Sequence, residues 1–268
     1  MNNLTILIMS LALCATAAWA GDVEDGVAAS VRKDYVTALS KYKSAAAKNN
    51  AVAQLRIGML YDEGLGVKQD YAEAVRWYKL AAAQGDAIAQ YNLAIKYDYG
   101  QGVVQDYTEA VRWYKLAAAQ GLASAQYNLG LKFANGQGVV QDYAEAVRWY
   151  KLAAAQGISY AQSNLGSMYQ DGLGVAQDYA EAVRWYKLAA AQGDASAQSN
   201  LGVMYATGRG VLQNNIQAHM WFNIAAVKGE KNAVKNRDIA ASKMTTEQIA
   251  QAQRLAKECQ ARNYKNCD

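Results

Sequence analysis

The chain has 268 residues, and its 27 basic and 23 acidic side chains give a formal net charge of only +4. One histidine and three cysteines leave few side chains for metal ligation or for nucleophile–base catalysis. This near-neutral balance is a poor electrostatic match for nucleic acid, so we expect no nucleic-acid partner.

Residues 1–20 have the features of a secretory signal peptide. An apolar run over residues 4–18 leads into a small-x-small cleavage site at residues 18–20. The run is short for a bilayer span, although no lysine or arginine precedes it. The bulky Leu13 disfavours lipoprotein cleavage at Cys14, which is expected to leave with the signal. We expect an exported protein, periplasmic or secreted, with no integral membrane segment after cleavage; the alternative is an uncleaved anchor.

Residues 21–50 are predicted to form an N-terminal helical cap. Tyr35 is in phase with the repeats described below, but its half-unit is divergent, as is typical of a terminal repeat that faces solvent. A short helix over residues 23–31 is expected in front of it. The cap contains two Ser-x-x-Lys strings, Ser30–Lys33 and Ser40–Lys43, a pattern of penicillin-interacting enzymes. The Ser-Asp-Asn and Lys-Thr-Gly elements of such enzymes are absent from the sequence.

The stretch Gln69–Gly85 organises the rest of the chain. It returns with a period of 36 residues, nearly unchanged three times and then in a more divergent copy: 105–121, 141–157, 177–193 and 213–229. A period this strict indicates a repeat array, in which each unit buries its apolar face against its neighbours.

Each copy of this stretch is predicted to form one helix. Asp70 is a favourable N-cap, and Glu73 three positions later would complete a capping box. Gly85 is placed to end the helix in the left-handed conformation. Tyr78 is expected to face the core, and Trp77 is expected to supply the largest buried apolar surface.

A second helical pattern lies between the copies, at residues 89–97 and their echoes, and each is followed by a Gly-x-Gly-Val turn such as Gly64–Val67. Paired glycines permit positive φ and close approach of helices, and the turn does not match a phosphate-binding loop. Ala94 departs from this pattern, because the other copies carry glycine there. Arg56 departs from it as well, because the other copies carry asparagine.

The Ala-Gln-x-Asn-Leu-Gly-x-x-Tyr, Gly-x-Gly-Val and Ala-x-x-Trp-Tyr signatures recur in phase over residues 51–229. Together they resemble the Sel-one-like repeat (SLR), a bacterial relative of the tetratricopeptide repeat. The resemblance implies an all-α fold: a right-handed α-solenoid (superhelix) of about five 36-residue helix-turn-helix repeats with helical caps.

Residues 230–268 are predicted to form a C-terminal helical cap with a cysteine-containing tail. Two closing helices are expected over residues 231–241 and 247–261, the second opened by a capping box of Thr245 and Gln248. The net charge of +4 over residues 228–268 is interpreted as a solvated basic surface, with an anion site as the alternative.

Cys259 and Cys267 are the thiols that remain after processing, and in an exported protein such a pair predicts a disulfide. Their spacing does not fit a Cys-x-x-Cys redox motif. The lone His219 stands where Val75 stands in its repeat, so it is interpreted as a core residue. We therefore expect no metal, no cofactor and no catalytic residues.

Differences among the copies indicate where a partner would bind. Some first-helix positions barely change between copies, while others on the opposite side of the helix do change. By resemblance the first helix lines the concave surface, so the changing positions are candidates for contact with a protein or peptide partner: Leu55, Met59, Tyr91, Ile95, Tyr127 and Leu131. The alternative is that adjacent first helices bury these side chains against one another.

These observations favour an exported repeat scaffold for protein–protein interactions, an adaptor in envelope assembly, periplasmic signalling or host contact. Two alternatives stay open at this point: a cell-wall or β-lactam-interacting hydrolase, and a regulator or inhibitor of an envelope enzyme. The sequence does not indicate the oligomeric state.

Overall fold

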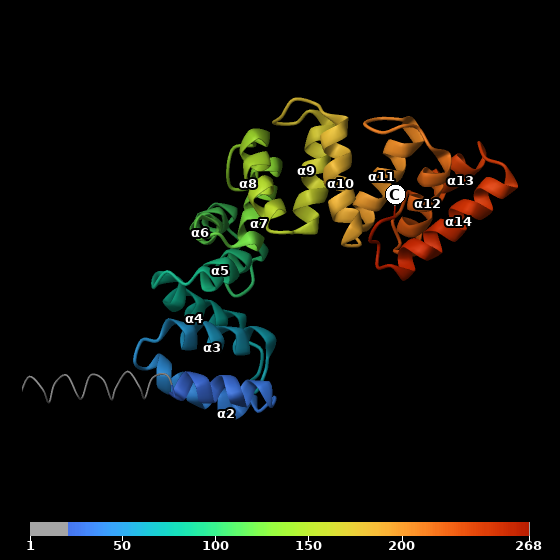
Figure 1. Ribbon diagram of the computed structural model, residues 1–268. Helices are drawn as coiled ribbons and strands as arrows, with labels where there is room; N and C mark the ends of the chain where they lie inside the picture. The colour runs from blue at the N-terminus through green and yellow to red at the C-terminus, as the bar shows by residue number, and fades with distance from the viewer. Residues whose placement is uncertain (1–20, 268) are drawn as a thin grey trace, which may run out of the picture. The chain divides into compact units, whose positions relative to one another are not determined.

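The computed structural model describes residues 21–267, and within them all regular structure is helical, without a β-strand (Figure 1). The predicted signal peptide and Cys14 lie outside the described residues. Residues 21–31 are helical, and α2 (Tyr35–Ala46) follows. Two helices per repeat come next: α3 (Ala51–Glu63), α4 (Tyr71–Ala83), α5 (Ala87–Tyr99), α6 (Tyr107–Ala119), α7 (Ala123–Asn135), α8 (Tyr143–Ala155), α9 (Ser159–Asp171), α10 (Tyr179–Ala191), α11 (Ala195–Thr207) and α12 (Asn215–Val227). The chain closes with α13 (Ala233–Ala241) and α14 (Thr246–Ala261). The prediction of an all-α array of helix-turn-helix repeats is confirmed.

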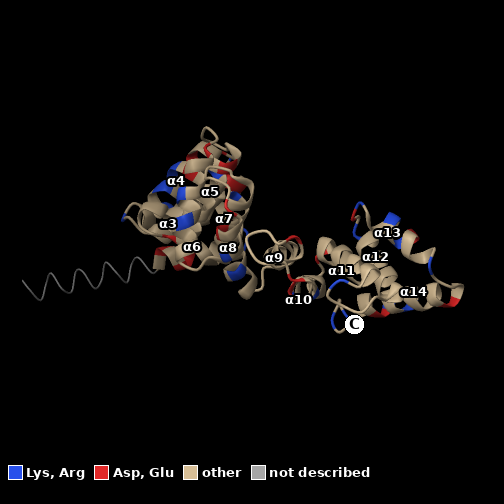
Figure 2. Ribbon diagram, turned by 90° about the horizontal axis from the view of Figure 1, so that it is seen from above, with Lys and Arg blue, Asp and Glu red and all other residues tan. Residues whose placement is uncertain are grey.

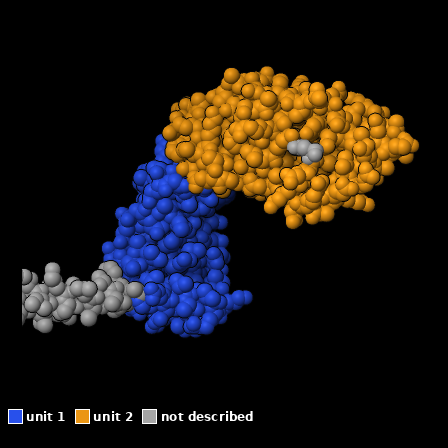
Figure 3. Space-filling model, viewed as in Figure 1, with its two compact units in different colours: residues 1–125, 137–139 blue, residues 126–136, 140–268 orange. Residues whose placement is uncertain are grey.

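The described residues form two compact units, 21–125 with 137–139 and 126–136 with 140–267 (Figure 3). In the first unit α4 packs against α3 of its own repeat and α5 of the next, and in the second unit α10 packs likewise against α9 and α11. Basic and acidic residues are mixed on the helices of each unit (Figure 2). The helices α4 and α10 therefore each join two consecutive repeats.

An aspartate starts the second helix of each of the first four repeats. The Asp70 Oδ1 atom accepts hydrogen bonds from the amides of Ala72 (2.9 Å) and Glu73 (3.0 Å). The predicted capping box is wrong in its second half. The Asp70 amide donates to the Tyr61 carbonyl at 2.9 Å, and the Glu73 carboxylate instead pairs with Arg76 at 2.9 Å. The N-cap thus also ties the turn back to the preceding helix.

The Gly-x-Gly-Val turns close against the preceding repeat. Gly64 ends α3 with a φ of 69°. Gly102 has a φ of 74°, and a Cβ atom there would lie 2.3 Å from the Tyr71 carbonyl oxygen. Only glycine fits a position with both positive φ and so close a backbone contact, which agrees with the interpretation of these glycines as turn residues.

The core of each of the first four repeats is built around a tyrosine of the second helix, and Phe222 takes this place in the fifth. Tyr78 is 1% exposed and packs with Leu93 of the next repeat. At Gly58 a Cβ atom would lie 2.6 Å from the Tyr78 ring, so the glycine makes room for it. The expectation for Trp77 is wrong: this side chain is half-buried, with the Arg76 guanidinium 4.9 Å from its ring centroid. Consecutive residues of an α-helix lie about 100° apart around its axis, so Trp77 points away from the core that Tyr78 faces.

The C-terminal cap covers the last repeat, because α13 and α14 both pack against α12. The capping box of α14 is confirmed: Gln248 accepts from the Thr245 amide at 2.9 Å, and Thr245 accepts from the Gln248 amide at 3.3 Å. Under this cover Trp221 is only 3% exposed. Cys259 and Cys267 form a disulfide inside the same apolar cluster, with their Cα atoms 5.2 Å apart.

Candidate functional site

The residues predicted to line a binding surface lie on α3, α5 and α7, and they differ in burial. Leu55 is 4% exposed and belongs to the apolar cluster around Tyr78, so it is a core residue and we remove it from the predicted surface. The other five side chains are half-buried: Met59, Tyr91, Ile95, Tyr127 and Leu131. Their contact with a partner stays a prediction.

Two of these side chains are tyrosines that pack against other aromatic rings. In the first unit the Tyr91 ring centroid lies 5.9 Å from that of Tyr114. In the second unit the Tyr127 ring lies 6.1 Å from Tyr150 and 6.2 Å from Tyr160, and burial raises the pKa of Tyr127. Packing on one side fixes these rings while the other side stays accessible, which lowers the entropy lost on binding.

A buried polar cluster crosses the first unit. The Lys96 ammonium donates to the Asp62 carboxylate and to Gln101 Oε1 (2.9 Å), and it lies 4.6 Å from the Tyr71 ring centroid. The Tyr78 hydroxyl donates to Asp62 at 3.1 Å, and burial together with this carboxylate raises the pKa of Tyr78. These contacts neutralise the buried charges and link α3, α4 and α5.

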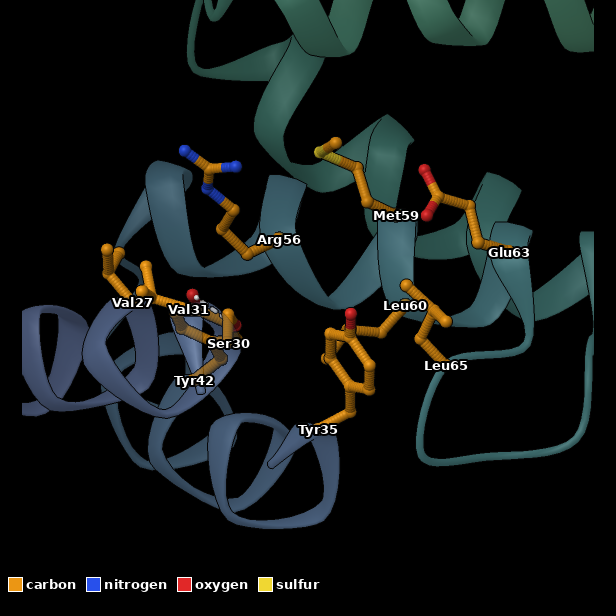
Figure 4. Close-up of a pocket in the computed structure, with 10 residues that line it drawn as sticks. All are labelled: Val27, Ser30, Val31, Tyr35, Tyr42, Arg56, Met59, Leu60, Glu63 and Leu65. Carbon is orange, nitrogen blue, oxygen red and sulfur yellow. Dashed lines mark hydrogen bonds between the residues drawn. The ribbon is translucent and has the colours of Figure 1, made fainter. Parts of the chain in front are cut away.

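The first unit also has a pocket of about 380 Å³, which sequence reasoning missed (Figure 4). Its apolar lining comes from Val27 and Val31 on the helix of residues 21–31, and from Met59 and Leu60 on α3. One sequence signal pointed to it, because Arg56 on its rim replaces the asparagine of the other four copies.

Two charged side chains stand at this pocket without a partner. Within residues 21–267, neither Arg56 nor Glu63 forms an ion pair or a hydrogen bond. The Ser30 hydroxyl of the first Ser-x-x-Lys string also lines the pocket, and it is hydrogen-bonded to the Tyr42 hydroxyl at 3.2 Å. The pocket therefore combines an apolar lining with one unpaired cation and one unpaired anion.

His219 lies in the core of the last repeat, where it is 3% exposed. Its Nδ1 atom has no hydrogen-bond partner in the described part of the chain, and burial lowers its pKa. The side chain is therefore neutral at pH 7. Over residues 21–267 no group of three or more His, Cys, Asp or Glu side chains is placed to hold a metal ion.

Stacked helical hairpins with half-exposed apolar first helices define a helical repeat scaffold. A family model described as the Sel1 repeat matches five consecutive segments: 51–86, 87–122, 123–158, 159–194 and 195–229. The chain belongs to the Sel1 repeat family. The resemblance seen in the sequence is thereby confirmed.

Solved structures include similar proteins. A Sel1 repeat protein from Oxalobacter formigenes is 37% identical, with a TM-score of 0.76 over 80% of this chain and 88% of that one. The protein c5321, a protective antigen of uropathogenic Escherichia coli with an SLR fold, is 28% identical over 92% of this chain and 70% of that one, with a TM-score of 0.45. The search of curated proteins returned no match. No helix within residues 21–267 is long and apolar enough to cross a membrane.

Proposed function

We propose that the protein is an exported scaffold that holds partner proteins on the first-helix faces of its repeats. The observation that carries this proposal is the set of half-buried apolar and aromatic side chains at positions that vary between otherwise similar repeats. Sel1 repeats typically mediate protein–protein interactions, which supports the same role here. Adaptor work in envelope assembly, periplasmic signalling or host contact fits such a scaffold.

Export is the second part of the proposal. The apolar residues 4–18 with their small-x-small site support it, and a disulfide between Cys259 and Cys267 persists only in an oxidising compartment. Cell fractionation followed by intact-mass measurement tests it. We expect a periplasmic or secreted chain that begins at Gly21; a cytosolic chain that retains residues 1–20 would contradict export.

Crosslinking in the native envelope, read out by mass spectrometry, tests the binding face. The double variant Tyr91→Ser/Tyr127→Ser introduces the residue that the fourth and fifth repeats carry at this position, Ser163 and Ser199. We expect crosslinked partners to fall at least about fivefold while the thermal midpoint stays within a few degrees. Tyr99→Ser is the matched control, because Tyr99 is 70% exposed on α5 and lies outside the proposed face. A large loss of stability, or no change in crosslinks, would contradict the proposal.

The proposed scaffold is not an enzyme, in keeping with a family of helical repeat proteins that is generally non-catalytic. Incubation of the purified mature protein with a chromogenic β-lactam tests this point. We expect no turnover. A rate that disappears in Ser30→Ala would establish the hydrolase alternative instead.

A further inference from the structure

The N-terminal cap imitates a repeat but lacks its turn. A Cβ atom at Gly26 would lie 2.5 Å from the Tyr42 ring, much as Gly58 meets Tyr78. The cap helix connects to α2 through residues 32–34 alone, with no Gly-x-Gly-Val segment. Val31 stays 79% exposed beside the first helix of the first repeat. The pocket therefore occurs where a cap helix, and not a complete repeat, precedes α3.

Arg56 does not have to contact a core tyrosine hydroxyl, as the asparagine at the equivalent position of the second repeat does. In the second repeat the Asn92 side chain lies beside the Tyr78 hydroxyl of the preceding repeat and interacts with it. In the cap, Ser30 satisfies the equivalent Tyr42 hydroxyl. The guanidinium of Arg56 is consequently available to a ligand, and Figure 4 shows it above Val27 and Val31.

The two unpaired charges stand at opposite ends of the pocket. Arg56 and Glu63 are seven residues apart on α3, which corresponds to two helical turns and about 10.5 Å along the axis. Met59 lies between them, and Leu60 and Val27 form part of the apolar lining (Figure 4). A complementary ligand has an anion at one end, an apolar group in the middle and a cation about 10 Å from the anion.

We propose that this pocket binds the C-terminal end of a partner polypeptide whose last residue is apolar and whose third residue before the end is lysine or arginine. The proposal rests on the scaffold function and names the partner chemistry at one place in it. The terminal carboxylate pairs with Arg56, the last side chain enters the apolar lining, and the basic side chain pairs with Glu63.

Polypeptide chemistry explains each part of this assignment. Guanidinium groups bind carboxylates bidentately, and only a C-terminal residue carries an apolar side chain and a free main-chain carboxylate on one Cα atom. An extended chain advances about 3.3 Å per residue, so a basic side chain three positions upstream reaches the region of Glu63. The pocket volume of about 380 Å³ lies within the range of small-ligand sites.

Fluorescence polarisation with the mature chain, residues 21–268, tests the proposal. The probe is an N-terminally labelled pentapeptide, Ala-Lys-Ser-Ala-Phe, with a free C-terminal carboxylate. We expect saturable binding that falls about tenfold or more when the peptide is amidated or when its phenylalanine becomes serine. Arg56→Asn should cause the same loss and should fold, because asparagine stands there in the other four repeats. Arg112→Gln on α6 is the matched control outside the pocket and should bind normally.

A charge exchange adds a test that a structural defect cannot imitate. Glu63→Lys should weaken the lysine peptide and should regain affinity for Ala-Glu-Ser-Ala-Phe. Four results would each overturn the assignment. The first two are equal binding of the amidated and free peptides, and full binding by the Arg56→Asn variant. The other two are displacement of the peptide by an equal concentration of decanoate, and no binding at millimolar peptide. Such a result leaves the scaffold proposal standing if crosslinks still depend on Tyr91 and Tyr127, so the two failures are distinguishable.

Discussion

Replacing Lys96 by methionine tests how much the stability of the first unit depends on the charge pairing between Lys96 and Asp62. The Lys96 side chain is 6% exposed and that of Asp62 is 20% exposed. Removing one partner of a fully buried pair costs about 3–5 kcal/mol, because the other charge is left without compensation. Partial exposure of Asp62 and its bond to Tyr78 reduce this, so Lys96→Met should cost about 2–3 kcal/mol.

The chain itself supplies the matched control. Two repeats after Asp62 and Lys96, Ala134 and Met168 occupy the equivalent positions and contribute to one apolar cluster. The double variant Asp62→Ala/Lys96→Met should therefore lie within about 1 kcal/mol of the native protein, so that adding Asp62→Ala restores at least about 1 kcal/mol of what Lys96→Met alone removes.

Urea unfolding followed by circular dichroism measures these stabilities, and hydrogen exchange in α3 and α5 localises the loss, because repeat arrays open locally. A Lys96→Met variant as stable as the native chain would refute the reasoning, as would a double variant as weak as the single one.

Three further predictions concern stability. Burial lowers the pKa of His219, so the folded state binds fewer protons than the unfolded state below about pH 6.5. The free energy of unfolding should therefore fall from pH 7 to pH 5, by at most about 1.4 kcal/mol per pH unit. Urea unfolding at a series of pH values should show a shallower fall for the His219→Phe variant. Gly102→Ala should lower the thermal midpoint far more than Gly58→Ala, because Gly102 has positive φ against backbone whereas alanine already stands at the place of Gly58 in the second repeat. Dithiothreitol should destabilise the α14 end by about 2–3 kcal/mol in native protein and leave Cys259→Ser unchanged, as measured by hydrogen exchange.

The repeated second helix could be predicted in detail because each of its features is local. The N-cap at Asp70, the core position of Tyr78 and the turn glycines follow from one 36-residue period. The capping box failed because a tertiary bond to Tyr61 already uses the Asp70 amide. Trp77 was misassigned because size was weighed above its angular position relative to Tyr78.

The charged core pair and the pocket depend on contacts between repeats, which the period does not specify. A signal for the pair was present, because Asp62 and Asp98 are each followed 34 residues later by lysine, whereas Ala134 is followed by Met168. The pocket depends on the packing of Gly26 in the cap helix against Tyr42. The sequence separation of this pair is four residues shorter than that of Gly58 and Tyr78 in the first repeat. That placement occurs once, so the comparison between copies offered a single signal, the departure of Arg56 from the asparagine of the other four repeats.

Sequence identity among the second helices has a consequence for how such a chain can change in length. The helices α4, α8 and α10 have the same thirteen residues, and α6 differs from them only at Thr108. Excision of residues 123–158 would present to α9 the same side chains that α8 presents now, apart from that threonine. Gain or loss of a whole 36-residue repeat by recombination would therefore create no new kind of helix–helix contact. The length of the array can then vary independently of the two helical caps.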